Sequence, residues 1–325
     1  VGPDKGILHL ATGAVVNAVW DLWGKYEKKP VWQLVYDMSP KEIVRLIDFR
    51  YLTDALKPEE ALEILENSSA DKKNRLSILM DEGYPCYNTS AGWLGYSDEK
   101  LHELCVKAKK SGFSHLKFKV GKDLNDDIRR LKIARKALGK DVRIMIDANQ
   151  VWEVDEAIEW IKELEFADPF FIEEKTSPDD IAGHKKIKDA IQQIKVATGE
   201  MCQNRIIFKQ FIQDNALDIV QIDSCRIGGL NEILSVLLLA HKYDKPVWPH
   251  AGGVGLCEYV QHIAMIDYLL ISCEKNSKRI EYVDHLHEHF LNPCKVKAGK
   301  YSAPLNPGFS IEMKNETLTN YLYSD

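Results

Sequence analysis

Six residues able to bind a metal or move a proton recur at nearly constant spacing, each at the end of a short apolar, strand-like run. In order they are Lys119, Asp147, Glu173, Glu200, Asp223 and His250. The steps between them are 28, 26, 27, 23 and 27 residues, the length of one strand, one helix and their loops. In a barrel of alternating parallel strands and helices, the carboxyl ends of all strands open on one face, where active sites are built. The spacing therefore predicts one pocket ringed by these side chains.

Strand-like and helix-like segments alternate from about residue 84 onward, which predicts an α/β protein with a parallel TIM barrel. Expected strands cover 86–92, 115–121, 141–149, 169–175, 195–200, 219–224, 245–250 and 279–284, and expected helices cover 98–111, 124–138, 154–164, 231–243 and 255–270. A doubly wound dinucleotide-binding sheet is the competing architecture. The dense glycine cluster at 251–255 lacks the G-x-G-x-x-G spacing and the lysine of a phosphate loop, so the barrel is favoured.

The remaining residues fall into two further regions. Residues 8–26 place Val15, Val19, Leu22 and Trp23 on one face of a helix, and another helix is expected to start near Lys57. We expect 1–83 to be a helical appendage, 84–285 to be the barrel with the catalytic site, and 286–325 to return over the surface as an irregular segment.

Composition excludes several classes of partner. The 43 basic and 49 acidic residues give a net charge of −6, with both signs scattered, so we expect no nucleic-acid or anionic membrane partner. The longest apolar stretches are far shorter than the roughly 20 residues of a membrane span. Seven dispersed cysteines without a C-x-x-C pair favour reduced thiols in an intracellular compartment. Residue 1 is Val, and no signal or transit segment precedes the first helix, so we expect any targeting peptide to lie outside this sequence.

Asp147, Glu173 and Glu200 form the predicted metal site. Three converging carboxylates repel one another unless a cation lies among them, and hard oxygen ligands select Mg²⁺, Mn²⁺ or Ca²⁺. Glu174 leaves an ambiguity, because alternation along a strand sends it to the side opposite Glu173, and spacing does not choose between the two.

Lys117 and Lys119 lie two residues apart, so their side chains share one side of a strand. Lysines close to each other and to a cation are expected to have lowered pKa values, which would make Lys119 a base near neutral pH. His250 and Asp223 end adjacent strands, and a carboxylate bonded to one imidazole nitrogen raises the basicity of the other. The triplet of His285, His287 and His289 lies beyond the last strand, and we interpret it as part of a mixed polar stretch rather than a second metal site.

Together these groups suit one kind of chemistry. A cation binds a substrate carboxylate, Lys119 or His250 removes the adjacent α-proton, and the cation with Lys117 stabilises the charge that develops. This combination is a known solution for proton abstraction next to a carboxylate.

The motifs carry a resemblance over nearly the whole chain. In order they are ATGAVVNAVWDLWGK, SAGWLGY, KFKVG, DANQVW, FIEEKTSPDD, ATGE, QIDSCRIGG, PHAGGVGLCE and EYVDHLHEHF. In this combination the sequence resembles the enolase superfamily, mandelate racemase subgroup, and within it the L-fuconate dehydratases. The resemblance implies a modified (β/α)7β barrel with a partial helical capping domain at 1–83 and a 286–325 segment that returns over both.

The resemblance also implies roles for single residues. One Mg²⁺ is expected on Asp147, Glu173 and Glu200, with Lys119 as the base that takes the C2 proton and Lys117 beside it. His250, paired with Asp223, is expected to protonate the departing 3-hydroxyl. Expected substrate contacts come from Glu281, with Asn149 and Trp93 as further residues on the substrate side.

The implied reaction is dehydration of the acid sugar L-fuconate to 2-keto-3-deoxy-L-fuconate, in mitochondria. A racemase or epimerase, a dehydratase of another acid sugar, and a truncated, inactive regulatory protein with the same fold remain open. Family members begin with a β portion of the capping domain that closes over the substrate, whereas this sequence begins within that domain's helices. If that portion were absent from the molecule, we expect specificity and turnover to fail. The stereochemistry of the substrate is also open. The oligomeric state is open as well, and a homo-oligomer is compatible with the sequence.

Overall fold

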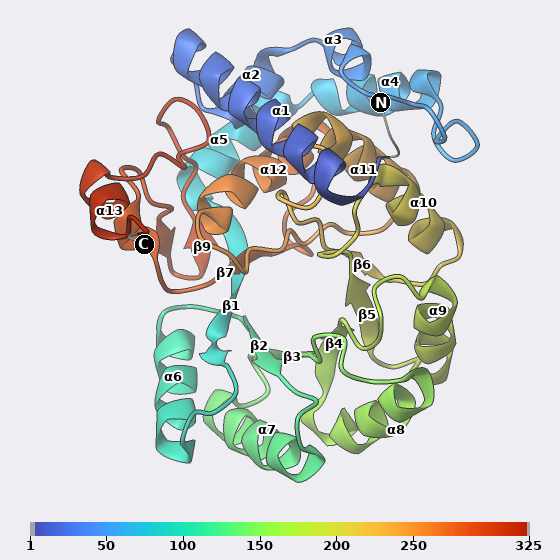
Figure 1. The fold of residues 1–325 in the computed structure, drawn as a ribbon, viewed down its shortest axis with the longest axis vertical. Coiled ribbons are helices and arrows are strands. Elements are labelled where there is room, and N and C mark those ends of the chain that lie inside the picture. The colour runs from blue at the N-terminus through green and yellow to red at the C-terminus, as the bar shows by residue number, and fades with distance from the viewer. Residues whose placement is uncertain (1–3, 324–325) are drawn as a thin grey trace.

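The computed structural model describes residues 4–323 (Figure 1). Helices form the first part of the chain, and strands then alternate with helices around a ring. The leading helices are α1 (Gly6–Glu27), α2 (Val31–Asp37), α3 (Pro40–Arg45), α4 (Pro58–Ser69) and α5 (Lys72–Glu82). The ring contains β1 (Tyr84–Gly92), α6 (Asp98–Lys110), β2 (His115–Lys119), α7 (Leu124–Leu138), β3 (Arg143–Asp147), α8 (Val154–Leu164), β4 (Pro169–Glu173), α9 (Ile181–Ala190), β5 (Lys195–Thr198), α10 (Arg205–Gln213), β6 (Ile219–Val220), α11 (Leu230–Lys242), α12 (Leu256–Leu270) and β7 (Ile280–Tyr282).

The strands are parallel and run around the ring in chain order, from β1 to β6, while β7 pairs with the other edge of β1. The segment 245–250, expected as a strand, is not a regular one. It joins the ring through a bridge between Val220 and Val247, through bonds from Trp248 N to Val220 O and from His250 N to Ile222 O, and through Glu281 N donating to Pro249 O. On the β6 side, hydrogen bonds run from Pro246 O through Trp248 N to His250 N, whereas Pro249 has no N–H to donate towards β7. The order is therefore that of the (β/α)7β barrel, confirming the fold class.

An apolar layer fills the interior of the barrel below the strand ends. It consists of Tyr87, Met145, Phe171, Ala197, Ile219 and Trp248, and these side chains are at most 1% exposed. Because side chains alternate along a strand, residues two positions further on face the same interior. Asp147 follows Met145, Glu173 follows Phe171 and His250 follows Trp248 in this way, so the functional side chains stand directly on the layer.

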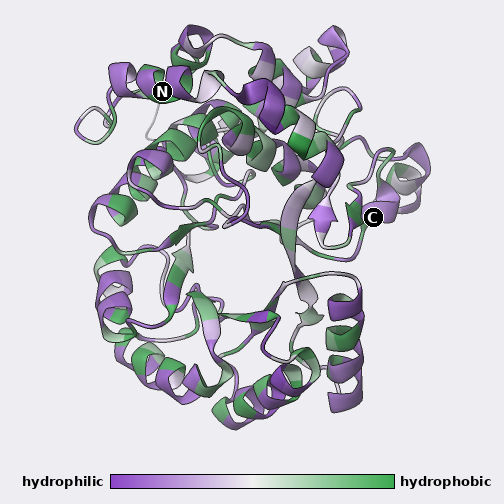
Figure 2. Cartoon of the chain, turned by 180° about the vertical axis from the view of Figure 1, so that it is seen from behind, coloured by the Kyte–Doolittle hydropathy of each residue, from purple (hydrophilic) through white to green (hydrophobic). Residues whose placement is uncertain are grey.

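Helices α11 and α12 are enclosed rather than lying on the surface. All fifteen residues of α12 are buried, since α2, α4 and α5 cover its outer side. Figure 2 shows these two helices as largely apolar ribbons under the leading helices. The leading helices therefore share one core with the barrel.

The apolar face expected on α1 points to solvent. Val15, Val19 and Leu22 are each more than half exposed, while Gly13, Trp20 and Gly24 are buried. A Cβ at position 13 would lie 2.4 Å from Ile227 O, so the glycines let this helix approach the barrel closely. Periodicity thus predicted the helix correctly, but the face of the helix that packs against the barrel is the one with the small glycines, not the one with the apolar side chains.

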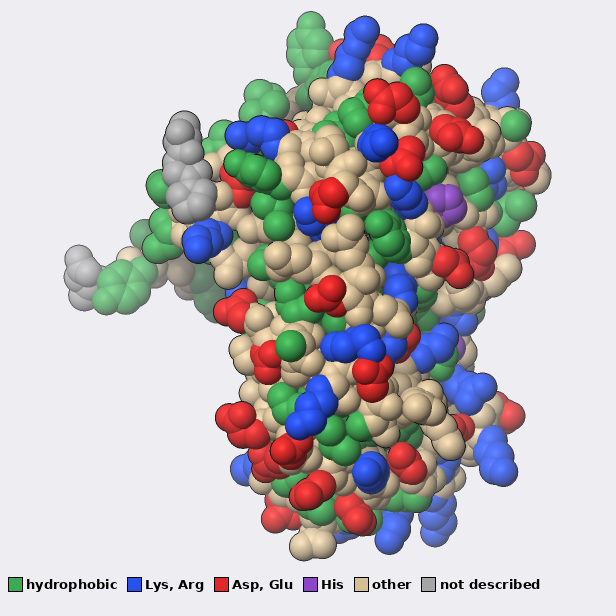
Figure 3. Space-filling model, turned by 90° about the vertical axis from the view of Figure 1, so that its right-hand side faces the viewer, with side chains coloured by type: hydrophobic (Ala, Val, Ile, Leu, Met, Phe, Trp, Pro, Cys, Tyr) green, Lys and Arg blue, Asp and Glu red, His purple; other side chains and the backbone are tan. Residues whose placement is uncertain are grey.

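The last part of the chain passes beside β1 and β7. It contains β8 (Val296–Lys297), β9 (Lys300–Tyr301) and α13 (Asn315–Asn320), and β9 pairs antiparallel with the start of β1. Acidic and basic side chains are interspersed on the face drawn in Figure 3, without a region of one sign. Among the described residues, no helix has both the length and the apolar character needed to cross a membrane.

Candidate active site

Consecutive strand ends bring three predicted metal ligands to one side of the barrel mouth. Lys119 is in register with Asp147, Asp147 with Glu173, and Glu173 with Ala197, three residues before Glu200. Gly199 has φ +132, which a side chain rarely adopts, and this turn directs Glu200 towards the site. All three acids are at most 8% exposed.

Lys117 lies at the centre of a cluster of acids. Its Nζ is 2.8 Å from both carboxylate oxygens of Glu173, 2.9 Å from Glu281 Oε1 and 3.4 Å from Asp147 Oδ2. Although burial lowers the pKa of Lys117, these carboxylates raise it well above its ordinary value. The expectation of a lowered pKa included a neighbouring cation; without one, the carboxylates around Lys117 favour its charged form.

Lys119 lies at the outer edge of the same cluster. Its Nζ donates to Asp147 Oδ2 at 2.6 Å, and its side chain is 24% exposed while that of Lys117 is 1% exposed. Of the two lysines, Lys119 is therefore the one that can reach a molecule in the barrel mouth.

His250 and Asp223 form the pair that the strand ends predicted. His250 Nδ1 is 2.7 Å from Asp223 Oδ2, and Nε2 is 3.3 Å from Glu200 Oε2 and 3.7 Å from Glu281 Oε2. Burial lowers the pKa of His250, but Glu281, Asp223 and Glu200 raise it to about 10. Without a cation on Glu200, these carboxylates favour the protonated imidazole, which can act as an acid.

Glu281 connects the lysine and histidine halves of the site. Thr89 Oγ1 donates to Oε1 at 2.6 Å, and the N–H of Ala251 donates to Oε2 at 2.9 Å. Burial raises the pKa of this carboxyl, yet Lys117 and His250 hold it well below the ordinary range. Sequence reasoning missed Thr89, although alternation from Tyr87 along β1 would have placed it on the inner face.

Glu173 and Glu174 point to different partners. Glu174, with φ +44, accepts hydrogen bonds from Gln150 Nε2 at 2.6 Å and Asn149 Nδ2 at 3.4 Å. Asn149 and Gln150 also have positive φ, so three strained residues lie directly after two strand ends. Asn149 donates its backbone N–H to Asp147 Oδ1 at 3.0 Å, which places it beside the acids.

Trp93 and the histidine triplet make contacts of their own. Trp93 packs edge-on against His285, with ring centroids 5.2 Å apart. His287 contacts Glu258, and His289 contacts Thr317, so the three histidines face different neighbours. The triplet thus forms no metal site of its own.

The donor set suits a hard divalent cation. Burial raises the pKa of Glu173 to about 8, with Asp147, Glu281 and Glu200 adding to the effect against Lys117. The pKa of Glu200 is also raised, by burial first. In this structure the oxygens of the three predicted ligands are not all within 4.8 Å of one another, since the lysines and His250 hold them. Five acids share two lysines and one histidine; they are Asp147, Glu173, Glu200, Asp223 and Glu281. That excess of negative charge is what Mg²⁺ would offset.

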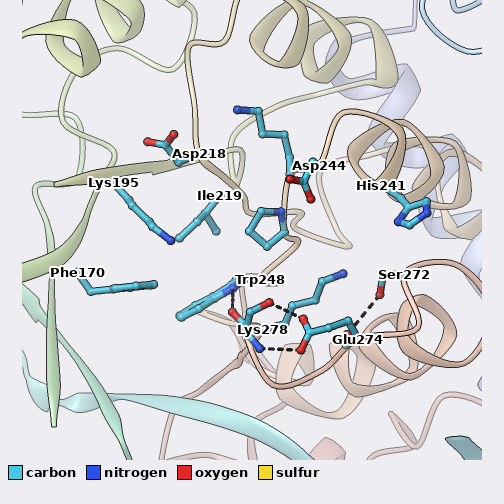
Figure 4. Close-up of a pocket in the computed structure, with 13 residues that line it drawn as sticks. Phe170, Lys195, Asp218, Ile219, His241, Asp244, Trp248, Ser272, Glu274 and Lys278 are labelled. Carbon is cyan, nitrogen blue, oxygen red and sulfur yellow. Dashed lines mark hydrogen bonds between the residues drawn. The ribbon is translucent and has the colours of Figure 1, made fainter. Parts of the chain in front are cut away.

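A cavity of about 670 Å³ opens at the opposite, amino end of the strands (Figure 4). Phe170, Lys195, Ile219 and Trp248 line it, and all precede the catalytic strand ends on their own segments. Lys195 Nζ lies 4.8 Å from the centroid of the Phe170 ring. This cavity is separated from the acids by the apolar layer inside the barrel and takes no part in their chemistry.

Comparison with known proteins agrees with this geometry. Residues 100–317 match the family model described as enolase C-terminal domain-like. The structure of human mitochondrial enolase superfamily member 1 has 53% sequence identity and a TM-score of 0.97, covering 100% of this chain and 74% of that one.

Two other relatives carry informative names. L-galactonate dehydratase of Hypocrea jecorina is 54% identical over 328 residues, which are 99% of this chain and 72% of that protein. The structure of a racemase from Streptomyces coelicolor with bound magnesium has 25% identity and a TM-score of 0.71, covering 97% of this chain and 73% of that one.

Proposed function

The chain belongs to the enolase superfamily, and from this premise we propose that it is a Mg²⁺-dependent acid-sugar dehydratase. The observation that carries the proposal is a lysine, Lys119, on one side of a cluster of acids and the hydrogen-bonded His250–Asp223 pair on the other. A dehydratase needs one group to remove a proton and another to supply one. The name of the 54% identical L-galactonate dehydratase supports the same class.

Each polar residue receives a role. Asp147, Glu173 and Glu200 would hold Mg²⁺, which when bound supplies an electrophile for the substrate carboxylate and for the charge that develops on it. Lys119 removes the C2 proton, and Lys117 stabilises the developing negative charge from its buried position.

The leaving group departs on the histidine side. His250 Nε2 gives its proton to the 3-hydroxyl, which leaves as water, and Asp223 keeps the imidazole oriented through Nδ1. The resulting enol takes a proton at C3 as it becomes the ketone, so one water is lost and a 2-keto-3-deoxy acid forms. Glu281, Asn149 and Trp93 are proposed as substrate contacts around this centre.

We further propose L-fuconate as the substrate and mitochondria as the location. L-fuconate is the 6-deoxy form of L-galactonate, so the two acids share the configuration of every carbon that the reaction touches. The mitochondrial location rests on the name of the 53% identical human relative. The substrate and the location are more specific than the class of reaction, so either one can be wrong while the protein is still an acid-sugar dehydratase.

A panel of acid sugars tests the proposal. L-fuconate, L-galactonate and their C2, C3 and C4 epimers are incubated with the protein and Mg²⁺ or with EDTA, and 2-keto acid is measured as its semicarbazone. We expect product from the L-galacto configuration in Mg²⁺ only, loss of product in Lys119→Met, and full activity in Lys122→Met, a change at an exposed lysine just beyond the strand. Interconversion of epimers without keto acid would identify a racemase or epimerase instead. No turnover of any sugar by the folded protein would favour a regulatory role.

A further inference from the structure

A second group of metal-binding side chains lies outside the active site. It joins Glu258 in the first turn of α12, His287 after β7, and Cys294 in the segment that returns over the surface. One ligand atom from each lies within 4.8 Å of the other two, and among the described residues this is the group that meets that distance. Glu258 is 1% exposed, so this is not a loose surface cluster.

The distances are close to those of a tetrahedral site. Zinc binds thiolate at about 2.3 Å and imidazole at about 2.0–2.1 Å, which places the two ligand atoms about 3.6 Å apart at a tetrahedral angle. Cys294 Sγ and His287 Nδ1 are 3.7 Å apart. Glu258 Oε1 lies 2.7 Å from the same nitrogen, so it would move outward by about 0.6 Å to the roughly 3.3 Å expected for an oxygen and a nitrogen ligand.

His287 is already fixed in the orientation that a metal ligand needs. Its Nε2 is 2.7 Å from Val283 O, a bond that requires the N–H on Nε2 and leaves Nδ1 facing the group. The ring also stacks on Tyr282, with centroids 5.3 Å apart and planes 3° from parallel. Such a partner on the far nitrogen is the usual companion of a metal-bound histidine.

Cys257 precedes Glu258 on α12, and its buried Sγ lies 3.9 Å from Ala251 O. Cys294 also borders a cavity of about 370 Å³ that includes Asn292 and Ser302, which provides a path for an ion to enter. A thiol, an imidazole and a carboxylate supply three ligands, and the fourth position is open to solvent from this cavity.

We propose that Glu258, His287 and Cys294 form a zinc site with solvent in the fourth position, separate from the proposed Mg²⁺ site. Sulfur and nitrogen ligands favour zinc over magnesium, whereas the active-site acids favour magnesium. Binding releases the protons of the Cys294 thiol and of His287 Nδ1 to solvent.

The zinc site lies where it would stabilise the loop and strand that carry active-site residues. Cys257 lies behind Ala251, which follows His250, and Ala251 N–H bonds to Glu281. Zinc would tie α12, the loop after β7 and the returning segment together at this point. It would thereby hold the loop that carries His250 and the strand that carries Glu281.

Cobalt provides the test, because a tetrahedral cobalt–thiolate centre absorbs strongly in the near ultraviolet and an all-oxygen site does not. Reduced, metal-free protein is titrated with Co²⁺ in saturating Mg²⁺, then with Zn²⁺, and bound zinc is also counted by elemental analysis. The variants are Cys294→Ser and His287→Gln, with Cys273→Ser as the matched control because it replaces an exposed cysteine elsewhere. Circular dichroism establishes that each variant is folded.

We expect one equivalent of Co²⁺ with thiolate charge-transfer absorption, displaced by Zn²⁺, lost in Cys294→Ser, weakened at least tenfold in His287→Gln and kept in Cys273→Ser. The inference is overturned if the folded parent shows no such absorption. It is also overturned if Cys294→Ser retains it, which would leave Glu258 and His287 as an ion pair only.

Discussion

Replacing Lys117 by Met tests how much its ion pairs with the buried acids contribute to stability, independently of catalysis. The change keeps an unbranched chain but removes the ammonium group that contacts Glu173, Glu281 and Asp147 within 3.4 Å. Breaking a buried ion pair destabilises a protein by about 3–5 kcal/mol. With an unfolding entropy of about 2.1 cal/mol/K per residue, that loss lowers the Tm of this 325-residue chain by roughly 4–7 °C.

The loss has a predictable dependence on pH and on Mg²⁺. Glu173 in the parent has its pKa raised to about 8, and removing Lys117 raises it further, so the variant is destabilised most above pH 8, where the carboxyl must ionise. At pH 5 the acid can take a proton and the loss is smaller. A divalent cation would replace the missing ammonium, so Mg²⁺ should stabilise Lys117→Met more than the parent.

Calorimetry at pH 5 and pH 8.5, with Mg²⁺ or EDTA, measures both effects. Lys275→Met is the matched control, because Lys275 is a buried lysine paired with Glu82 at 2.8 Å, away from the barrel mouth. We expect this control to lose less stability and to respond to Mg²⁺ as the parent does. An equal loss at both pH values, with no extra response to Mg²⁺, would refute the reasoning.

Three further predictions concern the same centre. His250→Asn should lower dehydration by about 10²–10⁴-fold yet retain exchange of the C2 proton in deuterated water, whereas Lys119→Met should lose both, as followed by NMR. The metal-free protein should become less stable from pH 5 to pH 8, because the raised pKa of Glu173 means that the folded state binds more protons than the unfolded chain. The raised pKa of His250 lowers the stability in the same way from about pH 6.5 to 10. Urea titrations at several pH values measure how the free energy of unfolding changes with pH. Gly199→Ala should destabilise the fold by about 1–3 kcal/mol and weaken Mg²⁺ binding, since φ +132 disfavours a Cβ that would lie 2.6 Å from Gln221 O; unchanged calorimetric binding would contradict that role.

The sequence was most informative where chemistry and periodicity coincide. Strands ending at Lys119, Asp147 and Glu173 lie where their apolar runs predicted, because alternation fixes the inner face and the following acid stands above an inner apolar residue. The His250–Asp223 contact was likewise predictable from two adjacent strand ends.

Other features depend on tertiary contacts that a linear pattern does not contain. The strand expected at 245–250 is present only as a bridge between Val220 and Val247, and Pro249 cannot donate towards β7. Helices α9 and α10 were not predicted, although Asp180 and Asn204 cap their first turns and are recognisable start signals. The pKa of Lys117 could not be foreseen, because it depends on Glu281, which lies 164 residues away in sequence and 2.9 Å away in space.

The most direct test of the account follows the fate of hydrogen during turnover. Full-length protein, Mg²⁺ and L-fuconate are incubated in deuterated water, and the product is examined by proton NMR. Abstraction by Lys119 and delivery by His250 predict a 2-keto-3-deoxy acid with one deuterium at C3 in a single configuration. Recovery of the unchanged acid with deuterium only at C2, or of its C2 epimer, would contradict the assignment of His250 as the acid that expels the 3-hydroxyl.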